Sequence, residues 1–457
     1  MPQLSQSGRI VKLVTVSQGH CFFALPGDTT WTATTNATGE IPPLNATGLI
    51  YSASNIQKLW FADGVNYVYY DPSNDTVYPW LATAGTLPQD SDGNTPRHIV
   101  TWRGRTVVSG LFLEPQNIFF SSVGDPTNWD YAPENPTATQ AIALNLANMG
   151  LIGDTVTSLC PYTDDVLIVF GDHSINLLRG DPLDGGRRDL VTDTIGAVWG
   201  KPWCMDPYGT VYFFSNKMGV YTLVPGQKPL RISQSIDNLL SRINTGTHGI
   251  TMVWDDAHQG CHLFITLLEE VAETTHYWFD WRTQAWWQVK FGNKDHNPLC
   301  TCILDGNEPE DRVVLTGGWD GYVRAMSLDA AEDDGEAIES EVVIGPILTA
   351  MFDEVMWGEM QAVLGTDSGE VGYELYSGAT AELALAALEA RTEPTATGTW
   401  SGSNGEDGEY GGRNVTELVK SAAHAHYLRL FSTEQWAFEA LRVKIGARGQ
   451  VRRRGRD

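Results

Sequence analysis

The chain has 457 residues and a formal net charge of −26, from 56 acidic and 30 basic side chains. A surface this acidic repels nucleic acid, which argues against DNA binding as the main function. The length exceeds what one hydrophobic core usually supports, and 46 Gly with 16 Trp, 16 Tyr and 15 Phe favour many short aromatic strands joined by tight turns.

The main recurring pattern is a short apolar run, a tight turn with Gly, Asp or Asn, and a second apolar run, which is typical of a β-hairpin. Turns of several neighbouring hairpins lie roughly 40 residues apart, close to the period of a four-stranded propeller blade. We therefore predict an all-β fold in which residues 1–328 form a β-propeller of about six irregular blades. The clearest hairpins, in chain order, are residues 58–70, 98–108, 165–178, 209–223, 276–289 and 313–323.

The character of the sequence changes at residue 329. Residues 329–345 begin with an acidic stretch that lacks aromatic side chains, and we predict an acidic linker there. Beyond it, residues 372–376, 427–431 and 438–445 alternate polar and apolar side chains, which predicts a C-terminal β-rich domain over residues 346–457. Within that domain, residues 381–390 give the best helical pattern of the chain, and Thr395–Gly412 is predicted to be a loop.

No apolar run is long enough to span a membrane, and the first 19 residues lack the charge and apolar pattern of a signal peptide. We therefore expect that the chain does not span a membrane and that it is synthesised in a cytoplasm. The six cysteines are scattered along the chain, which predicts reduced and mostly buried thiols rather than a disulfide framework. They are Cys21, Cys160, Cys204, Cys261, Cys300 and Cys302.

The common signatures of catalysis are missing: there is no P-loop, no G-x-S-x-G elbow, no H-E-x-x-H and no dinucleotide fingerprint. Glycan cleavage stays open because propellers can host it and because it needs two carboxylates. Turn carboxylates usually only cap backbone groups, so we predict no catalytic residue and no cofactor. The available acids are Asp154, Asp164, Asp165, Asp255 and Asp256.

The best candidate metal ligands are His296, Cys300 and Cys302, to which Cys261 and His262 could be added. Their C-x-C spacing lacks the paired C-x-x-C arrangement of most structural zinc sites. The alternative is that the thiols pack as small apolar side chains on strands. We therefore predict no metal site.

Basic side chains cluster at the C-terminus of this otherwise acidic chain. They could clamp an acidic partner surface or contact packaged DNA phosphates, or they could form a disordered, solubilising end. We favour a protein partner, because one short tail is weak anchorage to DNA against so much negative charge. The interface candidates are Arg448, Arg452, Arg453, Arg454 and Arg456.

The segment 102–110, followed by 117–129, resembles the tail nozzle (tail hub) proteins of short-tailed bacteriophages. In that family a strand ends in Ser, and a Gly-Asp-Pro turn and an aromatic follow. Here the turn motif is Gly124, Asp125, Pro126 and Trp129. Segments 164–176, 196–203 and 210–221 resemble the family's order of blades, and 436–445 with the Arg-rich end is also similar.

The resemblance implies a structural virion protein of the phage tail, a propeller subunit in a homohexameric ring below the portal. It implies portal or adaptor proteins above, needle, plug or fibre proteins below, and DNA passing through the channel without specific binding. It implies no catalytic residues. The alternative is a receptor- or glycan-binding tail protein, with exposed aromatics beside carboxylates or amides on one propeller face. A tail glycan hydrolase is less favoured.

Overall fold

The computed structural model describes residues 2–5, 8–25, 28–37, 43–146, 154–305, 312–327, 330, 332–348, 354–402, 412–416, 419 and 421–448. The chain divides into two compact units. We call residues 1–290 with 294–326 the propeller unit, and residues 291–293 with 327–457 the sandwich unit.

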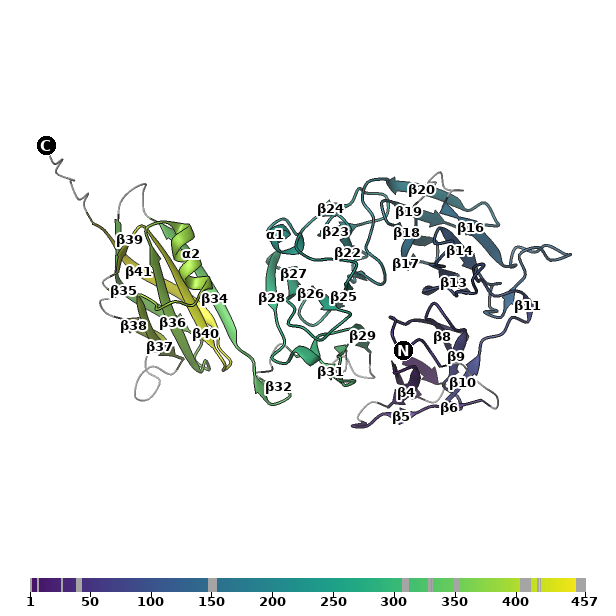
Figure 1. The fold of residues 1–457 in the computed structure, drawn as a ribbon, viewed down its shortest axis with the longest axis horizontal. Helices are drawn as coiled ribbons and strands as arrows, with labels where there is room; N and C mark the ends of the chain where they lie inside the picture. Colours follow the sequence, from purple (N-terminus) through teal and green to yellow (C-terminus); the bar gives the residue numbers. More distant parts are fainter. Residues whose placement is uncertain are drawn as a thin grey trace. The chain divides into compact units, whose positions relative to one another are not determined.

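The propeller unit is a series of small sheets that follow one another along the chain around a common centre (Figure 1). Four of them have four strands each, joined as antiparallel neighbours in chain order, which is the construction of a propeller blade. Their strands are β12 (His98–Trp102), β13 (Arg105–Ser109), β14 (Asn117–Phe120) and β16 (Ile142–Asn145); β17 (Val156–Thr163), β18 (Val166–Gly171), β19 (Ile175–Arg179) and β20 (Arg187–Thr192); β21 (Trp203–Met205), β22 (Val211–Ser215), β23 (Gly219–Leu223) and β24 (Leu230–Arg231); and β25 (His248–Asp255), β26 (Gly260–Leu267), β27 (His276–Asp280) and β28 (Ala285–Val289).

The remaining sheets of this unit are less regular. In the five-stranded sheet, the short β6 pairs in parallel with β10, whereas the other strands are antiparallel neighbours. Its strands are β6 (Thr35–Asn36), β7 (Tyr51–Asn55), β8 (Lys58–Ala62), β9 (Val68–Asp71) and β10 (Thr76–Pro79). Others are β1 (Pro2–Ser5) with β2 (Gly8–Val11), β3 (Leu13–Ser17) with β4 (His20–Ala24) and β5 (Thr32–Ala33), β11 (Ala84–Gly85) with β15 (Asn128–Trp129), and β29 (Cys300–Leu304) with β30 (Val313–Gly317) and β31 (Val323–Ala325). The helical turns are α1 (Asp237–Leu240) and η2 (Lys294–His296).

All six predicted hairpins form, as β8–β9, β12–β13, β18–β19, β22–β23, β27–β28 and β30–β31. The tightest turns have two residues with positive φ, as in type I′ turns, whose twist matches that of the flanking strands. Arg103 and Gly104 have φ of 51° and 70°, and Trp102 pairs with Arg105 across this turn. The all-β propeller fold predicted from the hairpin pattern is therefore confirmed.

Central strands of the blades are buried on both faces. All six residues of β18 and all five of β22 are buried. The reason is that the apolar clusters lie between successive blades: Phe120 of β14 packs with Leu159 of β17, and Phe214 of β22 packs with Trp254 of β25. Such strands read as continuous apolar runs, because neither face of the sheet meets water.

The sandwich unit has two sheets, ordered β34-β40-β36-β37 and β38-β35-β39, with β41 also pairing with β35. Trp357 and Met360 of one sheet pack against Leu375 and Leu428 of the other, which makes the core of the C-terminal β domain. Its strands are β34 (Ser340–Leu348), β35 (Glu354–Leu364), β36 (Glu370–Gly378), β37 (Ala396–Ser401), β38 (Arg413–Thr416), β39 (Ser421–Ala423), β40 (Ala425–Ser432) and β41 (Phe438–Arg448). The short pair β32 (Glu332–Asp333) and β33 (Glu336–Ala337) precedes them.

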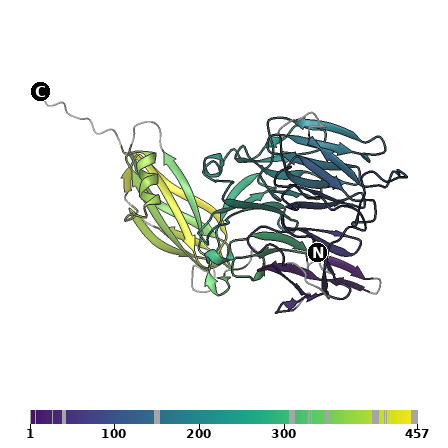
Figure 2. The ribbon, with the colours of Figure 1, turned by 45° about the vertical axis from the view of Figure 1, so that its right-hand side comes forward.

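The predicted helix is α2 (Ala381–Glu389), which lies against the sheet containing β36 and β40 (Figure 2). The Thr380 hydroxyl caps its N-terminus by accepting a hydrogen bond of 3.2 Å from the Leu383 N–H. On the inner face, Ala384 and Leu388 are buried against Tyr376 of β36. Cap and apolar spacing together explain why this segment is helical.

Two segments differ from their predictions. Residues 340–345, assigned to the acidic linker, belong to β34, because alternate side chains face the rest of the unit and this spacing suits a strand. Residues 396–401, assigned to the loop over residues 395–412, form β37 and pair with β36. Gly398 permits this pairing, because a Cβ atom there would lie 2.5 Å from the Tyr373 hydroxyl. Residues 403–411 of the predicted loop lie outside the described residues.

A buried arginine joins three strands of the sandwich unit. The Arg429 side chain on β40 pairs through Nε with Glu341 of β34 at 2.6 Å and through Nη1 with Glu374 of β36 at 3.1 Å. Glu339 also pairs with it, and its guanidinium lies 4.2 Å from the centre of the Phe431 ring. Burial tends to raise the pKa of Glu341, but hydrogen bonds from Arg429 and Arg391 outweigh burial and lower it.

We expect acid to weaken the sandwich unit through this cluster. Because the folded-state pKa of Glu341 is lowered, its stabilisation is complete above the unfolded value of about 4.3 and is lost as the pH falls through the folded value. Hydrogen exchange of β40 along urea titrations at pH 7, 5, 4 and 3 measures the effect. Arg429→Met should flatten the pH dependence; the same pH dependence in parent and variant would refute the role of the cluster.

Candidate functional site

The basic C-terminal cluster lies almost wholly outside the described residues. Arg448 ends β41, where its backbone pairs with that of Glu354 on β35. Nothing is described of the Arg448 side chain or of Arg452, Arg453, Arg454 and Arg456. The tail therefore follows directly from a strand of the sandwich unit, and its role as an interface stays a prediction.

The Gly-Asp-Pro turn belongs to the segment 117–129, which resembles the phage tail nozzle family. It follows β14 and is held by short-range hydrogen bonds. Gly124 has φ +72° and donates through its N–H to the Gly104 carbonyl at 2.9 Å. The Asp125 carboxylate accepts from both the N–H and the hydroxyl of Thr127, at 2.9 and 2.6 Å. These bonds fix the position of the Pro126 carbonyl.

That carbonyl joins two blades. The indole N–H groups of Trp80 and Trp129 both donate to the Pro126 oxygen, at 2.9 and 2.8 Å. Trp80 follows β10 of one sheet, whereas Trp129 belongs to the turn region of the next blade, and both rings are buried in one cluster. Gly85 of β11 pairs in parallel with Trp129, and a Cβ there would lie 2.2 Å from the Trp129 carbonyl. We call this arrangement the tryptophan clasp.

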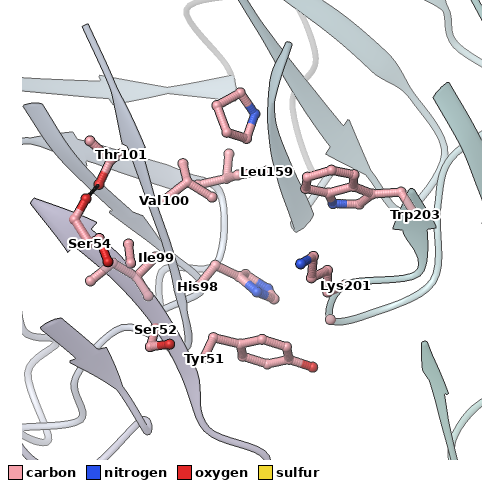
Figure 3. Close-up of a pocket in the computed structure, with 13 residues that line it drawn as sticks. Tyr51, Ser52, Ser54, His98, Ile99, Val100, Thr101, Leu159, Lys201 and Trp203 are labelled. Atoms are coloured by element: carbon pink, nitrogen blue, oxygen red, sulfur yellow. Dashed lines mark hydrogen bonds between the residues drawn. The ribbon is translucent and has the colours of Figure 1, made fainter. Parts of the chain in front are cut away.

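A cavity of about 260 Å³ opens between the innermost strands of four successive sheets (Figure 3). β7 and β12 form one wall, and β17 with the start of β21 forms the other. Its polar and aromatic lining includes Tyr51, Ser54, His98, Lys201 and Trp203. We call it the hub cavity.

The aromatic walls of the hub cavity are held by hydrogen bonds. The indole N–H of Trp203 donates to the Ser158 hydroxyl at 3.1 Å, and that hydroxyl donates to the Gly200 carbonyl at 2.6 Å. Burial raises the pKa of Tyr51 well above its usual range, although a hydrogen bond with the Lys201 backbone opposes the shift. Gly200, at φ +111°, is required here, because a Cβ would lie 2.3 Å from the Tyr51 hydroxyl.

His98 is neutral in the hub cavity. Its side chain is 3% exposed and packs 4.3 Å, centre to centre, from the Trp199 ring. Burial, with a smaller effect from Arg97, lowers its pKa to about 3. No hydrogen-bond partner of the His98 Nε2 atom is present among the described residues.

The candidate carboxylates are engaged in local structure. Asp154 accepts from the Thr155 and His173 N–H groups at 2.9 and 3.2 Å, and Asp255 accepts from the Ala257 N–H at 2.9 Å. Burial tends to raise the pKa of Asp255, but His262, whose Nε2 atom lies 3.8 Å from the carboxylate, and a hydrogen bond of 2.8 Å with His258 lower it, so this group is ionised at neutral pH.

The other three candidate acids lie near the surface. Asp256 pairs with Arg312, Asp165 lies 3.7 Å from Arg103, and Asp164 is exposed. Asp154 and Asp255 stand in different blades, and each is held by its own local hydrogen bonds. The lowered pKa of Asp255 is the reverse of what a general acid requires.

The proposed metal ligands are not drawn together. Cys261 is buried in an apolar cluster together with Cys204, whereas Cys300 and Cys302 on β29 are exposed. His296 lies 3.7 Å from Asp320. In the part of the chain that the structure describes, no group of three or more His, Cys, Asp or Glu side chains is arranged to hold a metal ion.

Two exposed aromatic side chains stack on each other in the described part of the propeller unit. Tyr208 and Trp281, which are 73% and 38% exposed, stack at 5.9 Å between ring centres across two neighbouring blades. Both follow aspartates that hold tight turns, Asp206 and Asp280. Of the described helices, none is long and apolar enough to cross a membrane.

No pattern in the sequence indicated the hub cavity or the part that Trp80 takes in the tryptophan clasp. Tyr51, His98 and Lys201 lie more than 40 residues apart, and no motif connects them. Only an exact blade register, which sets the first residue of each inner strand, would have brought them to one place. Irregular blade lengths removed that signal.

No family model matches the sequence, and no curated protein matches it. Several solved β-propeller structures are similar in fold. "YCF48 bound to D1 peptide" is 13% identical, with TM-score 0.39, over 62% of this chain and 79% of that one. The extracellular domain of the putative one component system BT4673 from B. thetaiotaomicron is 14% identical, with TM-score 0.45, over 79% of this chain and 42% of that one. BBS1N in complex with ARL6DN is 12% identical, with TM-score 0.40, over 69% and 86%. These likenesses concern the fold alone.

Proposed function

We propose that the protein is a structural component of a bacteriophage tail, forming the nozzle ring beneath the portal and lining the channel for DNA ejection. The observation that carries the proposal is the order of the segments that resemble the phage family. Segments 102–110, 164–176 and 210–221 lie on the hairpins β12–β13, β18–β19 and β22–β23 of consecutive blades, and the Gly-Asp-Pro turn follows β14. The basic end then follows from the last strand of a separate β-sandwich.

Physical features of the chain are consistent with a conduit. A net charge of −26 gives a surface that DNA phosphates do not adhere to, so DNA can move along it. A six-fold ring needs one heterologous interface per neighbour, with two different surfaces of the same subunit meeting at each junction. A chain with two compact units offers such surfaces without a dedicated symmetric patch.

Electron microscopy of the purified protein, alone and on tails of the virus that encodes it, tests the proposal. We expect closed rings with six-fold symmetry, at the position directly beneath the portal and adaptor. A monomer, or a trimer at the periphery of the tail, would contradict the nozzle assignment and favour a receptor-binding role.

The basic end gives a second test within the same assembly. Replacing the five C-terminal arginines by Ser should weaken attachment of the protein to portal–adaptor complexes, because charge-assisted hydrogen bonds to an acidic partner are removed. The matched control neutralises five exposed basic residues of the propeller unit and should leave attachment unchanged. These are Lys217, Lys228, Arg242, Arg282 and Lys290. Equal loss in both variants would show a general effect of charge.

A receptor- or glycan-binding role is the second candidate, favoured by the stacked and exposed Tyr208 and Trp281 pair. Exposed aromatic rings can stack on the apolar faces of sugars. Binding of host surface glycans that is lost in Tyr208→Ala and Trp281→Ala would support this function. Ring formation beneath the portal without glycan binding would exclude it.

A further inference from the structure

The hub cavity has a charge unlike the rest of the chain. The 13 residues that line it include one lysine, Lys201, and no aspartate or glutamate. The chain as a whole has 56 acidic and 30 basic side chains, so a cavity lined by a cation and no acid differs from the acidic composition of the chain. The ammonium group of Lys201 makes no ion pair with a described carboxylate and lies 5.5 Å from the centre of the Trp203 ring.

His98 lines the same cavity with a neutral ring. Figure 3 shows its ring lying beside Tyr51 and extending toward Lys201. Its Nε2 atom is buried on the side of Gly110, where a Cβ atom would lie 3.2 Å from it, so this atom faces the wall and not the open space of the cavity. Because the ring is neutral, Lys201 is the one cationic side chain among the lining residues.

The walls are preorganised. Trp203 is fixed through Ser158 to the Gly200 carbonyl, and Tyr51 is fixed against the Lys201 backbone. The Thr101 hydroxyl donates to the Ser54 carbonyl at 2.7 Å, which ties the two strands of the opposite wall together. A site whose side chains are already ordered loses little entropy when it binds a ligand. The volume of about 260 Å³ limits that ligand to a small molecule.

We propose that the hub cavity binds a small anionic ligand of about monosaccharide size, with its carboxylate or phosphate on Lys201. The aromatic rings of Tyr51 and Trp203 would contact its apolar face. The proposal does not rest on the nozzle assignment, because the site lies within a single propeller unit.

Calorimetric titration of the whole protein with glucuronate, glucose 6-phosphate and neutral glucose tests the site. We expect one or both anions to bind and glucose to bind at least tenfold more weakly. Binding of glucuronate alone would identify a carboxylate site, and binding of glucose 6-phosphate alone would identify a phosphate site. Binding of both would identify a site that recognises negative charge in either form. Equal binding of glucose, or no binding of either anion, would overturn the proposal.

Two variants locate the binding in the hub cavity. Lys201→Met should weaken anion binding about tenfold or more, whereas Lys217→Met, which removes an exposed lysine from a neighbouring turn, should not change it. Ser54→Glu introduces an acid at an exposed lining position and should abolish anion binding even if Lys201→Met does not fold. Unchanged affinity in a folded Lys201→Met or in Ser54→Glu would refute the site.

Discussion

Replacing Arg105 by Met is expected to lower the free energy of unfolding of the propeller unit by about 3–5 kcal/mol. The Arg105 side chain is fully buried, and its Nη atoms donate to the carbonyls of Ser121 at 2.9 Å and Ala138 at 3.0 Å. Nη2 also lies 3.4 Å from the Asp181 carboxylate, which comes from the next blade. Met fills similar space but leaves these acceptors and one carboxylate without their donor.

The size of this effect depends on burial rather than charge. Burial lowers the pKa of Arg105 and the ion pair with Asp181 opposes the shift, so the guanidinium is held in place mainly by carbonyl oxygens. A loss of this size is a large part of the roughly 5–15 kcal/mol that folded domains possess. Hydrogen exchange of β13 and β18 along a urea titration measures it for the propeller unit separately.

Arg103→Met is the matched control, two residues away. Arg103 is partly exposed and lies 3.7 Å from Asp165 and 3.9 Å from Asp181, so its removal should cost at most about 1 kcal/mol. If both variants lost the same stability, burial of Arg105 between the two blades would not explain its role.

Trp129→Ala should cost about 3–5 kcal/mol, because it empties a fully buried site at the centre of the tryptophan clasp. The loss should spread to the preceding sheet, since the ring packs beside Trp80 and shares the Pro126 carbonyl with it. Faster hydrogen exchange in β9 and β10 of the variant would show that spread. Exchange rates in β9 and β10 equal to those of the parent protein would contradict a clasp between blades.

Two variants separate packing from the hydrogen bond. Trp129→Phe keeps an aromatic ring but loses the indole N–H to Pro126, which should cost about 0.5–1.5 kcal/mol beyond the smaller ring volume. Trp287→Ala removes a tryptophan that is 50% exposed and should cost less than about 1 kcal/mol. A loss in Trp287→Ala as large as that in Trp129→Ala would mean that size alone, and not burial, governs the effect.

Much of the fold could be predicted because its determinants are local. A hairpin such as β12–β13 needs two apolar runs and a turn whose residues accept positive φ, and all of these lie within about a dozen neighbouring residues. The helix α2 likewise carries its cap and its apolar spacing within its own sequence. The strand β37 was missed because the space for it depends on Tyr373 of another strand.

The candidate site could not be predicted in the same way. The pattern identified the turn motif at Gly124, Asp125, Pro126 and Trp129, but not that Trp80 would share the Pro126 carbonyl. The acidic candidates Asp154 and Asp255 were visible in the sequence, yet their engagement by turn N–H groups appears only in the folded chain.

The all-β class, the six hairpins, the helix in the C-terminal domain and the acidic composition with its basic end could all be predicted from the sequence. Each follows from side-chain periodicity, turn chemistry or charge, which act between neighbours in the chain. In contrast, the burial of Arg105 between two blades and the meeting of His98 and Lys201 in one cavity are visible only in the folded chain. Those outcomes depend on how successive blades pack and on which inner-strand residues face the centre, and such contacts join residues that are distant in sequence.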